Sequence, residues 1–201
     1  MIATLGRFSL WLAFALAIYG AFVSLLGVRR RRPSLIESGQ GAVFAIFGLT
    51  TFAVLLMEAG LVGRDFSLEY VARNASIETP LFYTIIALWG ALEGSILLWI
   101  WLLALMTLLT VMIDGKRQPE LIPYVTAVLL CISAFFLLLV TLPANPFTTM
   151  LPAPLNGRGP NPLLQNHPLM AIHPPSLYAG YVGWSIPYAF GMAALITGRL
   201  G

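Results

Sequence analysis

Residues 81–113 read LFYTIIALWGALEGSILLWIWLLALMTLLTVMI, and this stretch decides the fold because it holds one charged residue, Glu93, among 33. A transmembrane helix needs roughly 20 apolar residues to cross a hydrocarbon core about 30 Å thick. As a single helix the stretch would be about 50 Å long at 1.5 Å per residue, which is more than one span requires. We therefore place a span at 92–113. Leu81–Ala91 is expected to project from the membrane, lie along its surface, or break away.

Four further apolar runs have the length of a membrane span, at roughly 8–28, 42–62, 121–142 and 175–197. The chain is 59% hydrophobic and 9% charged, whereas a soluble domain carries roughly 25% charged residues. These figures exclude a soluble fold. They predict an all-α integral membrane protein with about five transmembrane helices, forming a single membrane domain over residues 1–201.

The basic residues lie at the ends of the spans and predict the orientation of the chain. One set of connections holds seven of them and the other holds four, and the richer set is expected on the cytoplasmic side. The N-terminus is then outside and the C-terminus inside, with outer loops at 63–91 and 143–174. Although the net charge is +3, no basic-aromatic groove is apparent, so nucleic acid is not an expected partner. The richer set is Arg29, Arg30, Arg31, Arg32, Lys116, Arg117 and Arg199, and the other is Arg7, Arg64, Arg73 and Arg158.

The first span has the charge order of a retained helix. Only Arg7 precedes it, and four arginines follow it at 29–32, which is the reverse of a signal peptide. The longest connection, 143–172, contains seven of the 14 prolines and so cannot be regular helix or sheet. Its many leucine and phenylalanine residues predict an ordered, packed loop.

Glu58 and Glu93 are the acidic residues within or beside spans, where ionisable groups are often functional. Glu58 lies one turn from the outer end of its span and is interpreted as an interfacial carboxylate. Trp89 and Glu93 are four residues apart, as are Gly90 and Gly94, so each pair is expected on one helical face. The glycines and tryptophans have a structural explanation in close packing and interfacial anchoring. A carboxylate between two packing glycines also suggests a specific bond to another helix.

The segment from Met170 to Tyr181, MAIHPPSLYAGY, contains the most distinctive candidate site. Two prolines before a helical pattern mark a helix start, which fixes His173 at the outer mouth of the last span. Tyr178, Tyr181 and Tyr188 follow as an aromatic stripe. Two readings remain open, a haem axial ligand or general base and a helix-entry histidine bonded to a carbonyl.

Other chemistries find little support in the sequence. His167 is interpreted as structural, and the single Cys131 excludes an internal disulfide and a thiolate metal cluster. CxxCH, a phosphate-binding loop and a GxSxG elbow do not occur in the 201 residues.

Several separate motifs resemble the N-terminal part of the CcmF family of membrane haem lyases, which act in cytochrome c biogenesis. The matching stretches are WGALEGS at 89–95, NPF at 145–147, GRGPNPLLQ at 157–165, and HPP at 173–175 with YAGY at 178–181. The resemblance implies haem binding and covalent attachment of haem to apocytochrome c on the outer face of the membrane. It makes His173 an axial ligand of the haem iron, with six supporting residues and no assigned catalytic residue. The supporting residues are Trp89, Glu93, Pro174, Pro175, Tyr178 and Tyr181.

The resemblance also implies a setting for the protein. Haem, as haem b, is the substrate or a bound cofactor, and the implied partners are the haem chaperone CcmE, a CcmH-type thiol-handling subunit and apocytochrome c. The expected location is the bacterial inner membrane with the active surface facing the periplasm, or an organellar inner membrane for a split gene.

The family's tryptophan-rich segment and its other histidine ligands do not occur in these residues. The expectation is therefore a truncated or split protein that supplies half of a haem site, completed by the remaining part of the lyase. The rival hypothesis is a non-haem transmembrane scaffold or transporter fragment of a respiratory complex, in which His173 is a helix cap and Glu93 is a packing or ion-path residue.

Overall fold

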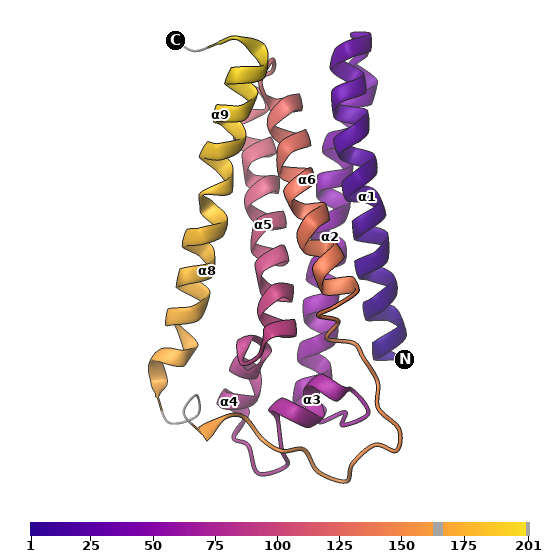
Figure 1. Ribbon diagram of the computed structural model, residues 1–201, viewed down its shortest axis with the longest axis vertical. Coiled ribbons are helices and arrows are strands. Elements are labelled where there is room, and N and C mark those ends of the chain that lie inside the picture. The colour runs from indigo at the N-terminus through magenta and orange to yellow at the C-terminus, as the bar shows by residue number, and fades with distance from the viewer. Residues whose placement is uncertain (163–166, 200–201) are drawn as a thin grey trace.

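The structure is a computed structural model that describes residues 1–162 and 167–199. Five helical segments are long and apolar enough to cross a membrane, and they stand side by side as a bundle (Figure 1). The described residues form no β-strand, only an isolated bridge between Leu68 and Thr149. The predicted all-α membrane fold is confirmed. The segments are α1 (Ile2–Arg30), α2 (Pro33–Val62), α5 (Leu92–Asp114), α6 (Ile122–Thr141), and a last run made of α8 (His173–Gly183) and α9 (Ser185–Thr197).

The two ends of the bundle differ in character. One end carries the N-terminus and the connections 63–91 and 143–172, and we call it the loop end. The opposite end carries the C-terminus and the short connections at 31–32 and 115–121 (Figure 1). This second end also holds the seven basic residues of the richer set, and we call it the arginine end.

Helices α1 and α2 form a tight hairpin that is longer than the apolar runs at 8–28 and 42–62. Arg31 ends α1 in the left-handed conformation, with φ 53°, and Pro33 begins α2 in its first turn. Hydropathy marks only the membrane-embedded part of a helix, and both helices continue beyond it through charged residues such as Arg29, Arg30 and Glu37. Close packing requires a glycine at position 39, because a Cβ there would lie 2.1 Å from the Ser24 hydroxyl oxygen.

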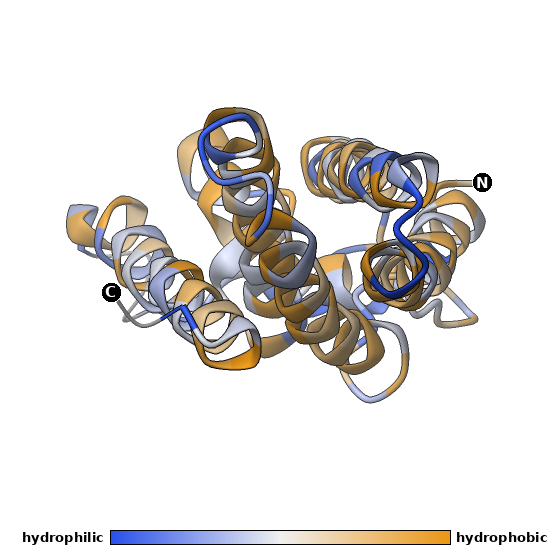
Figure 2. Cartoon of the chain, turned by 90° about the horizontal axis from the view of Figure 1, so that it is seen from above, coloured by the Kyte–Doolittle hydropathy of each residue, from blue (hydrophilic) through white to orange (hydrophobic). Residues whose placement is uncertain are grey.

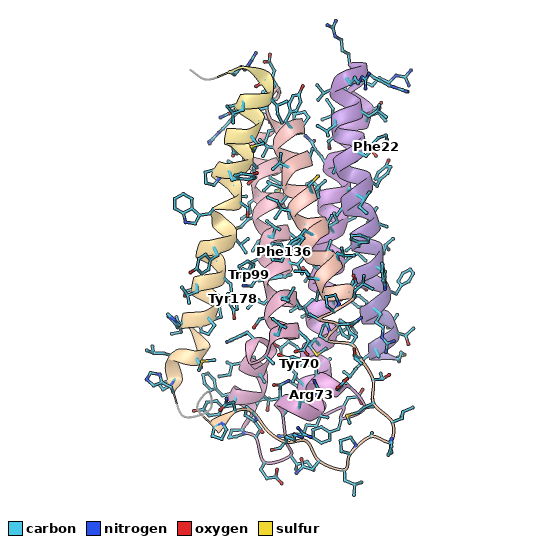
Figure 3. All side chains as sticks on the ribbon, viewed as in Figure 1. Phe22, Tyr70, Arg73, Trp99, Phe136 and Tyr178 are labelled. Atoms are coloured by element: carbon cyan, nitrogen blue, oxygen red, sulfur yellow. The ribbon has the colours of Figure 1, made fainter. Side chains whose placement is uncertain are left out.

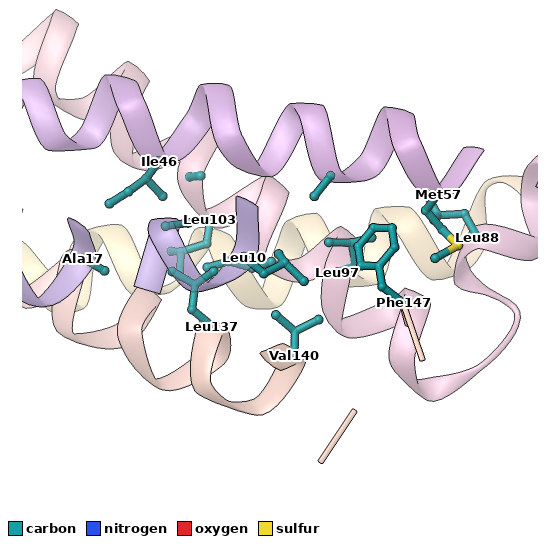
Figure 4. Close-up of a cluster of buried hydrophobic side chains, with 14 of the residues drawn as sticks. Leu10, Ala17, Ile46, Met57, Leu88, Leu97, Leu103, Leu137, Val140 and Phe147 are labelled. Atoms are coloured by element: carbon teal, nitrogen blue, oxygen red, sulfur yellow. The ribbon is translucent and has the colours of Figure 1, made fainter. Parts of the chain in front are cut away.

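The core of the bundle is mainly apolar and extends into the loop end. Leu10, Leu97, Leu137 and Phe147 are completely buried in it (Figure 4). Figure 2 shows hydrophobic residues on the outward surfaces of the helices as well, with hydrophilic residues in the connections. This distribution suits helices surrounded by lipid, which associate through van der Waals packing.

The last run bends at Trp184, between α8 and α9. Pro187 explains the bend, because its ring has no N–H for the carbonyl of Gly183 and clashes with that carbonyl. The run packs on α5 and α6 and stands at the edge of the bundle (Figure 1). Only 17% of the residues in its most apolar stretch are buried, compared with 33–50% in the other four segments. Its outward face is therefore uncovered.

The loop end is an ordered cap. Three short helices, α3 (Glu69–Asn74), α4 (Leu81–Ile86) and η1 (Ala87–Trp89), lie between the bundle and the proline-rich connection (Figure 1). That connection bonds to them through its backbone: the Arg158 N–H donates to Ala72 O at 2.8 Å, and the Gly159 N–H to Ala75 O at 3.2 Å. These bonds confirm the predicted order of the loop. Residues 163–166, which include the last three of GRGPNPLLQ, lie outside the described residues.

Candidate functional site

His173 is the first residue of α8 and is exposed at the loop end. A short 3-10 helix, η2 (Pro168–Ala171), precedes it. Pro174 and Pro175 occupy the first turn of α8, where a missing backbone N–H costs nothing because the first N–H groups of a helix have no partner within it. The prolines start the helix as predicted and fix the point at which the imidazole leaves the bundle.

A chain of hydrogen bonds ties both sides of His173 to η1 and to the loop-end part of α5. The Trp89 indole N–H donates to Met170 O at 2.8 Å, three residues before His173. The Ser95 hydroxyl donates to Trp89 O at 3.1 Å, and the Tyr178 hydroxyl donates to Ser95 Oγ at 3.1 Å. We call these four residues, Trp89, Ser95, Met170 and Tyr178, the brace. It restrains the backbone before and after the histidine.

Trp99 extends the brace along α5 with aromatic contacts. Its ring centroid lies 5.7 Å from that of Tyr178 and 6.2 Å from that of Tyr181, with Tyr181 nearly parallel at 21°. On its other side Trp99 contacts Phe136 of α6 at 5.3 Å. Figure 3 shows Trp99, Phe136 and Tyr178 together between the last run and the central helices. Tyr178 and Tyr181 of the aromatic stripe predicted below His173 thus contact Trp99, but only Tyr178 is half-buried, since Tyr181 is 61% exposed and Tyr188 is 57% exposed.

The outward face of α8 forms an open groove beside His173. Leu177, Gly180, Tyr181 and Trp184 line it with the histidine. Trp184 is 74% exposed and Tyr181 is 61% exposed, and a Cβ at Gly180 would have no atom within 4 Å. An imidazole nitrogen beside an apolar, aromatic wall is suited to binding a flat aromatic ligand.

Trp89 and Glu93 do not share a helical face, which corrects the expectation from their spacing. Ala91 is extended, with φ −142° and ψ 171°, and separates η1 from α5. Leu81–Ala91 has therefore broken away from the span, one of the three expected outcomes. Tyr70 holds the break from below, since its hydroxyl donates to Ala87 O at 2.8 Å and Leu88 O at 2.9 Å. Burial raises the pKa of the Tyr70 hydroxyl, which keeps it a hydrogen-bond donor.

Gly94 serves this break and forms no helix-packing face with Gly90. A Cβ at Gly94 would lie 1.8 Å from Leu88 O and 2.3 Å from the Tyr70 hydroxyl oxygen. Gly90 lies on the other side of the break and lines a small pocket with Asn74 and Met170. The break therefore explains the glycine at position 94.

Glu93 faces a different part of the loop end from His173. It lines a pocket with Glu69, Arg73 and Asn145, and Arg73 forms an ion pair with Glu69. Among the described residues Glu93 has no hydrogen bond or ion pair, so the predicted bond to another helix is not found. Its position in the first turn of α5 is favourable for a carboxylate beside the helix dipole.

Sequence reasoning singled out Trp89, Tyr178 and Tyr181 with His173, and the structure brings all of them to one side of the bundle. Sequence reasoning missed the positioning roles of Ser95 and Trp99. These two residues are four apart on α5, and Tyr178 and Tyr181 are three apart on α8. Each pair therefore lies on one face of its own helix, and this spacing was the signal that the sequence offered. His167 caps η2, because its Nδ1 accepts from the Leu169 N–H at 3.3 Å. No group of three or more His, Cys, Asp or Glu side chains that could hold a metal ion occurs in the described ranges 1–162 and 167–199.

The fold and site define a multi-pass α-helical membrane protein that presents one histidine beside an aromatic groove at the end of its bundle. The chain belongs to the cytochrome c assembly protein family, whose model matches residues 89–200. The matched part begins at Trp89 and includes the whole brace, His173 and the groove.

Individual relatives agree with the family. The chain is 42% identical over 201 residues to the cytochrome c-type biogenesis protein CycK of Rhizobium meliloti and 36% identical over 201 residues to CcmF of Escherichia coli. Both alignments cover 100% of this chain, and 29% and 31% of the relatives. A solved structure of the cytochrome c heme lyase CcmF matches 99% of this chain and 31% of its own chain, with a TM-score of 0.84 and 38% identity. The chain therefore spans about a third of the length of the relatives it matches.

Proposed function

We propose that the protein acts in cytochrome c maturation as part of a haem lyase, with His173 as an axial ligand of the haem iron. The observation that carries this proposal is the exposed His173 imidazole held between two points of the brace, beside the groove on α8. Membership of the cytochrome c assembly family supports the same role.

The residues present fit one side of a haem. His173 supplies an imidazole nitrogen, a common haem ligand, and Leu177, Tyr181 and Trp184 supply an apolar wall for the macrocycle. The other histidine, His167, has Nδ1 engaged with the Leu169 N–H. A second axial ligand would come from the remaining part of the lyase, and the uncovered face of the last run leaves room for that part to approach.

In this proposal the chain's own residues bind and orient, and none is a nucleophile or base. In cytochrome c maturation a cysteine S–H adds across each haem vinyl group, so a new C–S bond replaces one π bond and no oxidant is consumed. The contribution of the brace is to hold His173 in one position while apocytochrome c approaches. Restricting the motion of the bound haem and of apocytochrome c in this way lowers the entropic cost of their reaction.

The proposed setting follows from the charges. The arginine end is cytoplasmic under the positive-inside rule, so the loop end and His173 face the periplasm. The proposed partners there are the haem chaperone CcmE, a CcmH-type thiol-handling subunit and apocytochrome c.

The test is cytochrome c maturation in cells that carry His173→Ala, scored by haem-stained c-type cytochrome at matched membrane levels of the protein. We expect maturation to collapse, and His167→Ala, the matched histidine control, to retain it. Normal maturation with His173→Ala would make His173 a helix-entry residue and would contradict the proposal.

A further inference from the structure

A second groove lies at the arginine end, which is the end of the bundle opposite to His173. The turn between α1 and α2, the start of α6 and the end of α9 form its walls. Val28, Ile36 and Pro123 give it apolar sides, and Arg31, Arg199 and Glu120 place charges on its rim. Four helices and two connections thus meet around an amphipathic hollow.

The charge on the rim is positive and incompletely neutralised. Arg199 forms an ion pair with Glu120, whereas the Arg31 guanidinium has no hydrogen bond or ion pair within the described part of the chain. Arg31 ends α1 in the left-handed conformation, with φ 53°, which turns the chain sharply towards α2. The link between α1 and α2 thereby forms one side of the groove. Further positive charges flank the groove at the same end, namely Arg29, Arg30, Arg32, Lys116 and Arg117.

The depth of the groove matches that of lipid headgroups. Arg31 directly follows α1, and Arg199 lies two residues beyond the end of α9, so both guanidinium groups stand where the apolar spans end. Basic pockets between transmembrane helices at this depth bind anionic lipid headgroups. A guanidinium can also bond two phosphate oxygens at once.

We propose that this groove binds an anionic phospholipid, with Arg31 and Arg199 on the phosphate and the apolar sides along the start of an acyl chain. The site would tie α9, which carries the end of the weakly buried last run, to the α1–α2 hairpin. The proposal is independent of haem and adds a lipid ligand at the end of the bundle opposite to the candidate haem site.

The alternative is that the arginines act only through their total charge, as determinants of membrane orientation. Two double variants separate these accounts because each removes two positive charges from the same end. Arg31→Gln with Arg199→Gln removes the rim charges, and Arg30→Gln with Arg117→Gln removes two that do not line the groove. Glu120→Gln makes the opposite change, since it removes the negative charge and frees Arg199.

The experiment is native mass spectrometry of the full chain in mild detergent, titrated with phosphatidylglycerol and, separately, with phosphatidylcholine. We expect the wild-type protein to retain phosphatidylglycerol preferentially. Each rim arginine is expected to contribute about fivefold to the affinity, so that the rim double variant binds roughly 25-fold more weakly. The Arg30/Arg117 control should lose clearly less, and Glu120→Gln should bind more tightly.

Circular dichroism and the thermal midpoint of each variant establish that it is folded. An equal loss in the two double variants, equal retention of the two lipids by the wild-type protein, or weaker binding by Glu120→Gln would each overturn the proposal. The Glu120→Gln variant keeps the test decisive if the rim double variant does not fold, because its predicted effect has the opposite sign.

Discussion

At the scale of single residues, the candidate site depends on groups that touch the backbone around His173. Trp89 bonds to Met170 O, and Tyr178 reaches Ser95 across the interface between α8 and α5. Hydrogen bonds of this kind contribute about 1 kcal/mol each to stability, and groups that orient a metal ligand commonly affect metal affinity by about 10–100-fold. The brace is therefore expected to affect ligand binding more than folding.

Trp89→Phe tests this expectation because it keeps an aromatic ring and removes the bond to Met170 O. We predict a loss of about 1 kcal/mol in the free energy of unfolding in detergent and roughly tenfold weaker haem binding. Thermal unfolding and haem titration by visible absorption measure the two quantities.

Trp101→Phe is the matched control, since it removes the indole bond to the Thr51 hydroxyl, 2.9 Å long, between α5 and α2. It should cost similar stability and leave haem binding unchanged. If the two variants bind haem equally well, the brace does not position the site.

At the scale of elements, the loop end depends on bonds between segments that are far apart in sequence. The Asn156 side-chain amide bonds to both carboxylate oxygens of Glu78, at 3.2 and 3.1 Å, and its carbonyl accepts from the Ile77 N–H at 2.8 Å. Arg64 holds the same turn from the inner side, through bonds to Ser76 O and Thr79 O. The proline-rich connection is thereby fastened to the segment that leads into α4.

The pKa of the Glu78 carboxyl is sensitive to the bond between these two segments. The hydrogen bond from Asn156 is the main reason that the pKa of Glu78 is lowered from its ordinary value of 4.5. A pKa lower in the folded than in the unfolded protein means that this stabilising contribution is present above pH 4.5 and is lost as the pH falls through the folded value. Carbon NMR of labelled glutamate in micelles should show Glu78 titrating below 4.5.

Asn156→Ala should move the Glu78 pKa back towards 4.5, because it removes the hydrogen bond that lowers this pKa. A Glu78 pKa that is the same in both proteins would mean that the two segments are not joined through this bond.

The helices also show which parts of the fold could be predicted from the sequence. Hydropathy placed all five spans, because apolar length is a property of the chain itself. It started the third span at residue 92 but left three outcomes open for Leu81–Ala91, since the apolar pattern runs on from Leu81 and the observed break is held by tertiary bonds from Tyr70. The same break separated Trp89 from Glu93, which spacing had put together. His173 was found because its signal, two prolines at a helix start, is local.

At the scale of the whole molecule, the proposed function requires the two ends of the bundle to lie on opposite sides of the membrane, with the loop end outside. In a Cys131→Ser background, Leu155→Cys should react with an impermeant maleimide in intact spheroplasts, since Leu155 is 97% exposed. Lys116→Cys, at the arginine end, should react only after lysis. The reverse pattern would place His173 in the cytoplasm and contradict a periplasmic site.

The uncovered face of the last run is the other feature that belongs to the whole molecule. The chain covers 29% and 31% of the two relatives described above, and its histidine-bearing helix is the least buried of the five segments. An open groove beside His173 is then the expected form of a site that further helices complete.

Haem binding by His173→Ala, compared with His167→Ala and the wild-type protein, distinguishes an iron ligand from a helix-entry residue. Each protein is purified with the rest of the lyase and titrated with haem, and binding is followed by visible absorption. We predict that His173→Ala weakens haem binding by more than the roughly 10–100-fold expected of an orienting group, with added imidazole restoring part of the spectrum and His167→Ala binding normally. An unchanged spectrum and affinity in His173→Ala would show that His173 does not bind the iron.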